Sequence, residues 1–431
     1  MTSEIKHKHK PIKYEELQGS NFFRLKIAYS FILNRPIKLS NIRSDSTNPG
    51  MTQYEISFLR LVCEVSNGTK ININQTGTGF TLIPGTITNN YGDELEFECD
   101  KSRCITYYAE GLIPICLYGK ESLHIKLKGI THNLIDNSVD SFQMSTCVLL
   151  QKLIVGDTVE FKINKRGVLP NGAGEIYFKI PIITGLAPFD WVNEGKIKRI
   201  RGVAFTSKLP STFTTQMIDT CRHILNNFIP DVWIAVDNYK DKELDKISPG
   251  YGISITAETK EGFALSTDLM NDKEELTKNA NDISKECSIK FLNDVYKSGC
   301  TNCHNQGLFL FLMALSEKNY VSYMKIGKLS EHTKQVLRLI YKLFGVKFNI
   351  RECDEYDKEE SEEEEEGKNN DDDNENEEGE EKNDDNDNDN EESEDNNLKN
   401  KFNQEEIPMT YKQYIFSCVG IGLKNVARIE L

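Results

Sequence analysis

The sequence predicts an α/β protein, of the α+β kind, that contains three repeated units and one small inserted domain. In three places an apolar-periodic helix, a strand, a second helix and two closely spaced strands follow one another in the same order. These stretches of roughly 65 to 85 residues are typical of duplicated α/β units and too long for solenoid repeats. A segment with a different order separates the second unit from the third.

The first unit shows the signals most clearly. Asn34 to Pro36 and Asn67-Gly68 are turn sequences, and they separate apolar-periodic stretches. We expect helix, strand, helix, strand and strand at residues 23–33, 37–42, 54–65, 70–75 and 78–83.

The second and third units repeat this order. Alternating apolar and polar residues from Val159 to Ile163 predict a strand. In the second unit we expect the five elements at 103–117, 124–128, 141–153, 158–164 and 175–180. In the third unit we expect them at 306–315, 322–326, 331–344, 346–350 and 414–420.

Residues 186–288 predict a separate small α/β domain. The expected order is strand, helix, strand, hairpin and helix. The corresponding ranges are 197–205, 212–228, 232–236, 252–257 with 262–266, and 272 to about 289.

Charge is distributed unevenly along the chain. The whole chain has a formal net charge of −15, but the segment from Glu352 to Asp395 alone holds 27 acidic residues against three lysines. The remainder has 49 Lys and Arg against 40 Asp and Glu, a net charge of +9. A basic body favours partners with a phosphate backbone, because binding releases counterions. We therefore expect a nucleic-acid partner.

The predicted organisation has a basic arm, a core, an inserted domain and an acidic insertion. The low-complexity acidic insertion is predicted to be disordered. It is either a neutral expansion of a surface hairpin, which we favour, or a segment that shields the basic body from stray RNA. The arm spans 1–12, the first two units 13–185, the inserted domain 186–288, the third unit 289–351 with 409–431, and the insertion 352–408.

Cysteine usage and hydropathy indicate the compartment. The chain has 11 cysteines, an odd number spread thinly, and its opening lacks the apolar stretch of a signal peptide. The longest apolar run, 308–315, is too short to span a bilayer. We expect reduced thiols, no membrane partner, and a cytosolic or nuclear location.

One short motif could indicate a cofactor, and one motif typical of nucleotide sites is absent. Cys300-Thr301-Asn302-Cys303-His304 has the haem-attachment spacing, but neither an export signal nor a second metal-ligand pair accompanies it. Ordinary thiols near a helix start are the default interpretation. The chain contains no Walker A sequence. We predict no cofactor and no metal site.

Two basic segments are candidates for RNA contact. The glycine-rich loop from Arg166 to Glu175 links two strands and suits either phosphate approach or an ordinary hairpin. The other segment is a predicted strand, where alternation would place Lys196 and Lys198 on one face and Arg199 and Arg201 on the other. It is either a charged edge strand or an RNA-facing ribbon.

Ser330 to Thr333 predicts a helix start. Ser330 is the expected N-cap, and His332 falls in the first turn, where the helix dipole disfavours a protonated imidazole and attracts anions. Such a position suits a nucleophilic histidine that faces a phosphate. Its predicted buried stripe consists of Val336, Leu339, Ile340 and Leu343.

These pieces together resemble the RNA 3'-terminal phosphate cyclase superfamily, and within it the cyclase-like proteins of nucleolar ribosome assembly. The resemblance implies three βαβαββ units with mixed four-stranded sheets and an inserted thioredoxin-like domain. It covers about 20–350 and 411–431. It is carried by 34–38, Ile42-Arg43, Asn48-Pro49-Gly50, 66–68, 73–77, the 166–175 loop, 195–202 and 417–422.

The chain departs from the active cyclases at positions that contact nucleotide or phosphate. Leu-Gln-Gly-Ser-Asn at 17–21 replaces their glycine-rich loop, and Ser44 to Thr47 replaces a basic run. Glu55 stands where cyclases have a histidine, and Ala173 interrupts a run of three glycines. In contrast, His332 aligns with the histidine that cyclases adenylylate.

From this resemblance we predict a non-catalytic scaffold factor for small-subunit ribosome biogenesis in the nucleus and nucleolus. The implied partners are pre-ribosomal RNA, a nucleolar ribosome-biogenesis GTPase and proteins of the small-subunit processome. Two alternatives stay open: an active RNA cyclase or adenylyl-transfer enzyme that uses His332, and a pre-rRNA endonuclease. The predicted RNA contacts are Arg43, Arg166, Lys196, Lys198, Arg199 and Arg201.

Overall fold

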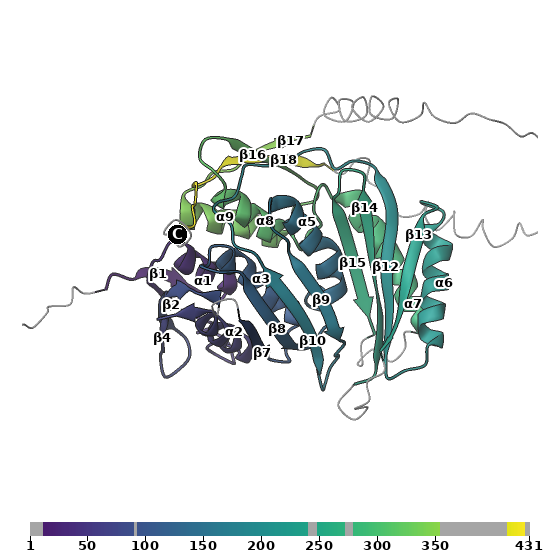
Figure 1. The fold of residues 1–431 in the computed structure, drawn as a ribbon, viewed down its shortest axis with the longest axis horizontal. Helices are drawn as coiled ribbons and strands as arrows, with labels where there is room; N and C mark the ends of the chain where they lie inside the picture. The colour runs from purple at the N-terminus through teal and green to yellow at the C-terminus, as the bar shows by residue number, and fades with distance from the viewer. Residues whose placement is uncertain (1–11, 90–92, 240–247, 272–278, 354–411, 427–431) are drawn as a thin grey trace, which may run out of the picture.

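The computed structural model describes residues 12–89, 93–239, 248–271, 279–353 and 412–426. Most of the predicted basic arm and nearly all of the predicted acidic insertion lie outside the described residues. The described chain is a mixed α/β protein with four four-stranded sheets and a two-stranded ribbon. Three of the sheets surround a group of helices, and the fourth stands at one side under α6 and α7 (Figure 1).

The first sheet has the order β1-β2-β5-β4, with β1 and β2 parallel and the other pairs antiparallel. The predicted elements are confirmed, with ends that differ by up to two residues. The bounds are β1 Glu15–Gln18, α1 Phe23–Ile32, β2 Ile37–Ser40, α2 Gln53–Glu64, β4 Lys70–Ile73 and β5 Phe80–Ile83. The ribbon pairs β3 (Ser66–Asn67) with β6 (Thr86–Ile87).

The second sheet has the same arrangement, in the order β7-β8-β10-β9. Its predicted second helix, 141–153, begins earlier and includes one π-helical turn. The bounds are β7 Glu94–Glu98, α3 Ile105–Cys116, β8 Leu123–Gly129, α4 Val139–Ser141, the π-helical turn Phe142–Thr146, α5 Cys147–Leu153, β9 Glu160–Lys165 and β10 Gly174–Ile180.

The third sheet repeats the arrangement as β11-β16-β18-β17. Its hairpin strand begins later than predicted, because Gly345 ends the preceding helix in the left-handed region and Val346 is buried in the core. Glu352 is still a strand residue, so the predicted insertion begins at least one residue later. The bounds are β11 Asp190–Trp191, α8 Gln306–Leu315, β16 Val321–Ile326, α9 Glu331–Phe344, β17 Asn349–Glu352 and β18 Tyr414–Val419.

The fourth sheet has the order β13-β12-β14-β15 and a hydrophobic core of its own. Residues 197–199 of β12 pair with β14 alone, whereas β13 pairs from Ile200 onward. The edge-strand interpretation of the basic segment at 196–201 therefore fits its first part and is wrong for Ile200 and Arg201. The start of the helix expected from 272 lies outside the described residues, and that helix ends at Lys297. The bounds are β12 Ile197–Ser207, α6 Thr212–Leu225, β13 Val232–Tyr239, β14 Gly250–Thr259, β15 Ala264–Met270 and α7 Ala280–Lys297.

Two elements cross the predicted domain boundaries. Strand β11 lies within the range predicted for the inserted domain, yet it pairs with β16 of the third sheet. Helix α7 continues past residue 288, and its Phe291 belongs to the core of the fourth sheet. The division into domains stays a prediction, although the first three sheets share one strand order.

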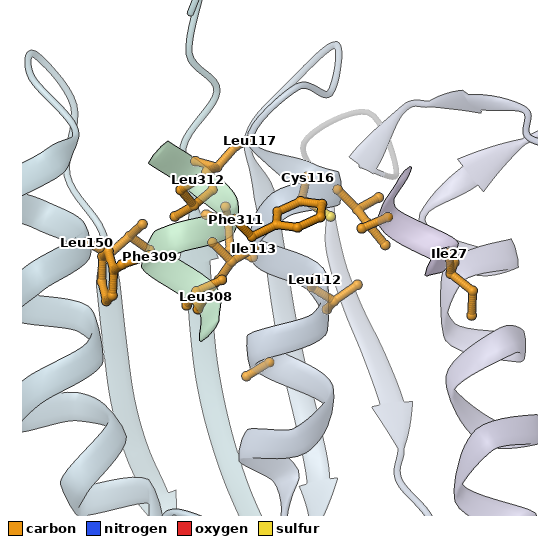
Figure 2. Packing of buried hydrophobic residues seen from close by; sticks show 14 of the residues in the cluster. Ile27, Leu112, Ile113, Cys116, Leu117, Leu150, Leu308, Phe309, Phe311 and Leu312 are labelled. Atoms are coloured by element: carbon orange, nitrogen blue, oxygen red, sulfur yellow. The ribbon is translucent and has the colours of Figure 1, made fainter. Parts of the chain in front are cut away.

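The main core lies between the first three sheets. All ten residues of α8 are buried, and Figure 2 shows four of them packed among side chains of α3 and α5. This helix contains the apolar run 308–315, which is therefore a core element. Among the described residues, no helix is both long and apolar enough to cross a membrane.

Candidate functional site

A cavity of about 460 Å³ opens between helices of the first three sheets, and His332 lines it. A neighbouring cavity of about 390 Å³ shares much of its wall. The loop before α1 and the helices α1, α2, α3 and α9 contribute side chains. Both cavities are lined by Arg24, Arg103, Tyr107, Glu110, His304 and His332, and the first also by Phe22, Arg43, Tyr54, Glu55, Gly307 and Gln335.

His332 lies in the first turn of α9, as the sequence predicts. Ser330 is the N-cap, because its Oγ accepts a hydrogen bond from Thr333 N at 3.0 Å. The predicted stripe of four apolar side chains is buried, and Gly345 ends the helix. The capped helix therefore places the imidazole at the positive end of the α9 dipole.

Two neighbours restrict the space around the His332 imidazole. The Phe22 ring lies 5.1 Å from it, centroid to centroid, at an interplanar angle of 54°. On α8, a Cβ placed on Gly307 would lie 3.5 Å from His332 Cε1, so the backbone of α8 also approaches the ring. Phe22 itself has a φ of 57°, a left-handed conformation that is rare for a bulky side chain. The segment at 17–21 thus leads directly to an aromatic residue beside the histidine.

The imidazole is predominantly neutral at pH 7. Partial burial lowers the pKa of His332 from its usual value of 6.5; Glu110 opposes this, and Arg24 and His304 lower the pKa further. Neither ring nitrogen has a hydrogen-bond partner among the described residues. A neutral imidazole keeps the lone pair that a nucleophile or a general base needs.

The arginines of the cavity are all paired with carboxylates. Arg43 donates to both oxygens of Glu55, at 2.9 and 2.5 Å, and also to Gly50 O. Arg103 binds the Asp136 carboxylate through Nε and Nη2. The third pair joins Arg24 Nη1 to Glu110 Oε2 at 3.0 Å.

Glu55 has a second role that holds it in place. Its carboxylate accepts a hydrogen bond from Thr52 N at 2.9 Å and completes a capping box at the start of α2. The side chain is almost completely buried, at 3% exposure. An incoming phosphate must therefore compete with a fixed carboxylate for the Arg43 guanidinium.

Tyr107 organises two of the guanidinium groups. The Arg24 guanidinium carbon lies 4.2 Å from the centre of the Tyr107 ring, and that of Arg103 lies 4.4 Å from it. Arg24 also donates to Tyr107 O. The ring therefore holds both cations near the cavity by cation–π contacts.

Arg166 lies away from this cavity and is buried. Its guanidinium binds both oxygens of Asp140, at 2.6 and 2.8 Å, and Asp237 Oδ2 at 2.6 Å. His132 Nε2 lies 2.9 Å from the same Asp140 carboxylate. The role of Arg166 in RNA contact stays a prediction, and its 3% exposure argues against it.

The predicted basic strand is also separate from the cavity. Lys196 and Lys198 are exposed, whereas Arg199 pairs with Glu258 at 2.7 Å and Arg201 with Asp231 at 2.7 Å. Of the six predicted RNA contacts, only Arg43 lines the cavity that holds His332. The others stay predictions.

The Cys-x-x-Cys-His segment contributes one residue to the cavity. Cys300 is buried and its Sγ lies 3.0 Å from Trp191 O, while Cys303 is exposed and borders the neighbouring cavity. His304 lines both cavities. No group of three or more potential metal ligands occurs among the described residues.

Sequence reasoning missed most of the cavity wall. Tyr107 and Glu110 lie on α3, Arg103 lies just before that helix, Arg24 lies on α1 and His304 lies just before α8. Two signals were available. Arg103, Tyr107 and Glu110 have the spacing of one helix face, and His304 belongs to the Cys-x-x-Cys-His motif, which was interpreted only as a haem or zinc motif.

Comparisons with known proteins agree with this geometry. A family model described as RNA 3'-terminal phosphate cyclase matches residues 15–350. The chain is 36% identical over 347 residues to the probable RNA 3'-terminal phosphate cyclase-like protein of Dictyostelium discoideum, covering 78% of this chain and 92% of that protein. It is 37% identical over 335 residues to the human RNA 3'-terminal phosphate cyclase-like protein, covering 77% and 88%.

A yeast relative has a more specific name. The chain is 31% identical over 344 residues to the rRNA processing protein rcl1 of Schizosaccharomyces pombe, covering 79% of this chain and 93% of that protein. The matches extend over most of every chain compared. On this basis, the chain belongs to the RNA 3'-terminal phosphate cyclase family.

Proposed function

We propose that this protein is a cyclase-like factor of rRNA processing that binds RNA without cyclising its end. The name of the Schizosaccharomyces pombe relative supports the rRNA process. The observation that carries the non-catalytic part is the Arg43–Glu55 pair. A buried carboxylate accepts hydrogen bonds from both terminal nitrogens of a guanidinium that would otherwise be available to a phosphate.

The RNA-binding part rests on charge and on the cavity. The chain outside Glu352–Asp395 has a net charge of +9. Three guanidinium groups and several aromatic rings line the same cavity. Stacking rings and cations are the groups that bind single-stranded RNA. We place the protein in the nucleus, in the nucleolus, on the pathway of the small ribosomal subunit. Its proposed partners are pre-rRNA, a ribosome-biogenesis GTPase and processome proteins.

His332 favours a second candidate, adenylyl transfer. The imidazole is neutral, is not hydrogen-bonded within the described chain, and stands at a helix N-terminus beside guanidinium groups. An endonuclease has less support, because no carboxylate cluster with metal-ligand spacing occurs among the described residues.

One experiment separates these candidates. The purified protein is incubated with labelled ATP, a divalent metal and RNA that ends in a 3'-phosphate, with an active cyclase in parallel. We expect no acid-labile AMP on the protein and no cyclised ends. Labelling that disappears in His332→Ala, together with cyclised RNA, would establish the enzyme instead; RNA cleaved internally would support the nuclease.

A further inference from the structure

A third cavity, of about 430 Å³, lies where the second and fourth sheets meet and does not include His332. Five segments form its wall: the segment before α3 with Ser102, the loop after β8, the β9–β10 loop, the start of β14 and the end of β15. Its surface is mainly apolar. The residues used below are Asn133, Leu134, Ile135, Val168, Leu169 and Met270.

Three aliphatic side chains at this cavity face solvent. Leu134 is 55% exposed, Ile135 is 68% exposed and Leu169 is 45% exposed. Single exposed aliphatic residues are common on protein surfaces, but a group around one apolar cavity is typical of an interaction site.

The loop that presents Leu134 and Ile135 is held by its own hydrogen bonds. Asn133 Oδ1 accepts from Ile135 N at 3.1 Å and from Asp136 N at 2.7 Å, and its Nδ2 donates to Asp136 Oδ2 at 3.0 Å. Arg103 binds the same Asp136 carboxylate. The aliphatic pair is thus presented on a rigid loop, which lowers the entropy lost on binding.

The opposite wall is also fixed in place. Thr131 N donates to Gly167 O at 2.7 Å, and Gly172 N donates to Val168 O at 3.1 Å. Asn171 N donates to Ser248 Oγ at 3.0 Å and connects the loop to the start of β14. The polar groups cited on both walls are used within the protein. The site therefore favours a ligand recognised by apolar contacts over a nucleobase recognised by hydrogen bonds.

Two lysines lie close to segments that form the wall. Lys101 lies beside the β9–β10 loop, since its Cδ is 3.6 Å from the position of a Cβ on Gly172. Lys208 follows Ser207, whose Oγ donates to Ser248 O at 2.9 Å. Both lysines are exposed, and neither has an ion-pair partner in the described part of the chain. Their charges favour acidic residues in a ligand.

We propose that this cavity is a docking site for a protein partner, which inserts aliphatic side chains from a short segment flanked by acidic residues. The volume lies within the range of about 300–1,000 Å³ that is usual for ligand sites. It suits a few side chains of one segment. Ile135 also borders the 390 Å³ cavity that His332 lines, whereas Leu169 borders neither of the His332 cavities, so Leu169→Asp separates the two sites.

The test uses the full-length protein and a phage-displayed library of short random peptides. We expect the enriched peptides to carry two Leu, Ile or Phe residues with Asp or Glu beside them. A synthetic enriched peptide is then titrated by fluorescence anisotropy. Ile135→Asp and Leu169→Asp should each weaken its binding about tenfold or more, as expected for an apolar anchor. Lys101→Glu with Lys208→Glu should weaken it and reverse its salt dependence.

Matched controls keep the result interpretable. Val155 is 89% exposed and lies outside the cavity, so Val155→Asp should leave peptide binding unchanged. Thermal unfolding of each variant checks that these surface changes leave the fold intact. Three outcomes would overturn the proposal: no enrichment, enriched peptides that bind Ile135→Asp as well as wild type, or enriched basic peptides. Self-association or single-stranded RNA binding that Leu169→Asp abolishes, without peptide binding, would identify a different occupant.

Discussion

At the residue scale, the ion pairs of three arginines decide how readily the His332 cavity can bind a phosphate group. Arg24, Arg43 and Arg103 would be enough to bind a phosphate group if they were free. Each instead has a carboxylate partner within hydrogen-bond distance. Glu55 is the most buried of these partners, at 3% exposure.

Replacing Glu55 tests this interpretation. Glu55→Gln keeps a side chain that can complete the capping box but removes the negative charge. We expect several-fold tighter binding of RNA that ends in a 3'-phosphate, and a salt dependence steeper by about one ion, because Arg43 becomes available. Filter binding over a range of salt concentrations measures both. Arg43→Ala combined with Glu55→Gln should cancel the gain, and a gain that persists would place the contact elsewhere.

Phe22 should control the protonation of His332. The pKa of His332 is lowered chiefly by burial, to which the Phe22 ring contributes. Phe22→Ala should therefore raise the pKa toward 6.5, as followed by NMR titration of the imidazole. Because the folded pKa lies below the unfolded one, His332 reduces stability as pH falls through about 6.5. A pKa that stays the same or falls in Phe22→Ala would show that the ring does not desolvate the histidine.

At the element scale, helix ends decide where the site residues stand. Ser330 and Gly345 bound α9, and a shift of one residue at its start would turn His332 out of the cavity by about 100°. The strands that precede the first helices of the first and third units, β1 and β11, were not predicted. The cause again lies in the elements themselves. Strand β1 is polar and β11 has two residues, so neither carries enough apolar pattern to be recognised.

The end of α9 provides a stability test. Gly345 has a φ of 71°, and a Cβ there would meet nothing within 4 Å. Gly345→Ala should therefore lower the free energy of unfolding by about 1–2 kcal/mol through backbone strain alone. Gly345→Asn should lower it less, because Asn tolerates the left-handed region. Urea denaturation measures both, and equal losses for the two variants would contradict a conformational cause.

At the scale of the whole molecule, buried charges join the second and fourth sheets. Asp140, Arg166 and His132 are each no more than 3% exposed, and Asp237 extends the group onto β13. Asp140→Asn leaves Arg166 buried beside a single carboxylate and should lower the free energy of unfolding by about 3–5 kcal/mol. Urea denaturation tests this, with Asp231→Asn as an exposed control that should have no measurable effect.

The same buried group makes the stability of the protein depend on pH. Burial would raise the pKa of Asp140, but the Arg166 and His132 partners outweigh burial and hold that pKa well below its usual 3.8. The unfolded carboxyl binds a proton near pH 4, so this stabilisation is present above that pH and is lost as pH falls further. Acid unfolding of Asp140→Asn should therefore show a smaller loss of stability below pH 4 than wild type. Identical acid profiles would show that the carboxylate contributes nothing.

The acidic insertion is the other feature of the whole molecule. Around it, Cys353 N donates to Gln413 O at 2.9 Å, and Lys412 Nζ lies 2.8 Å from Glu352 Oε1, so the two ends are close together. Replacing residues 357–408 with a short Gly-Ser linker should leave the thermal midpoint unchanged, because loop length costs little. We also expect unchanged RNA affinity at every salt concentration. Tighter binding at low salt would support shielding instead.

The sequence by itself determined the elements and their order. Periodicity in helices such as α8 and α9 is a local property of the chain, and so are the cap at Ser330 and the turn at Gly345. These signals predicted the α/β class and the position of His332 at a helix start. Ends differed where burial or a cap outside the pattern decided them, as for β17 and α7.

Tertiary structure alone decided which charges meet. The three sheets enclose one group of helices, and this packing brings together Arg24, Arg43, Arg103 and His304. Their positions along the chain do not predict that they meet. The same packing buries Arg166, a candidate RNA contact from the sequence, against Asp140 and Asp237. Periodicity reports only which face of an element is apolar. Pairing between distant side chains depends on how the elements pack, so the electrostatics of the site follow from the fold.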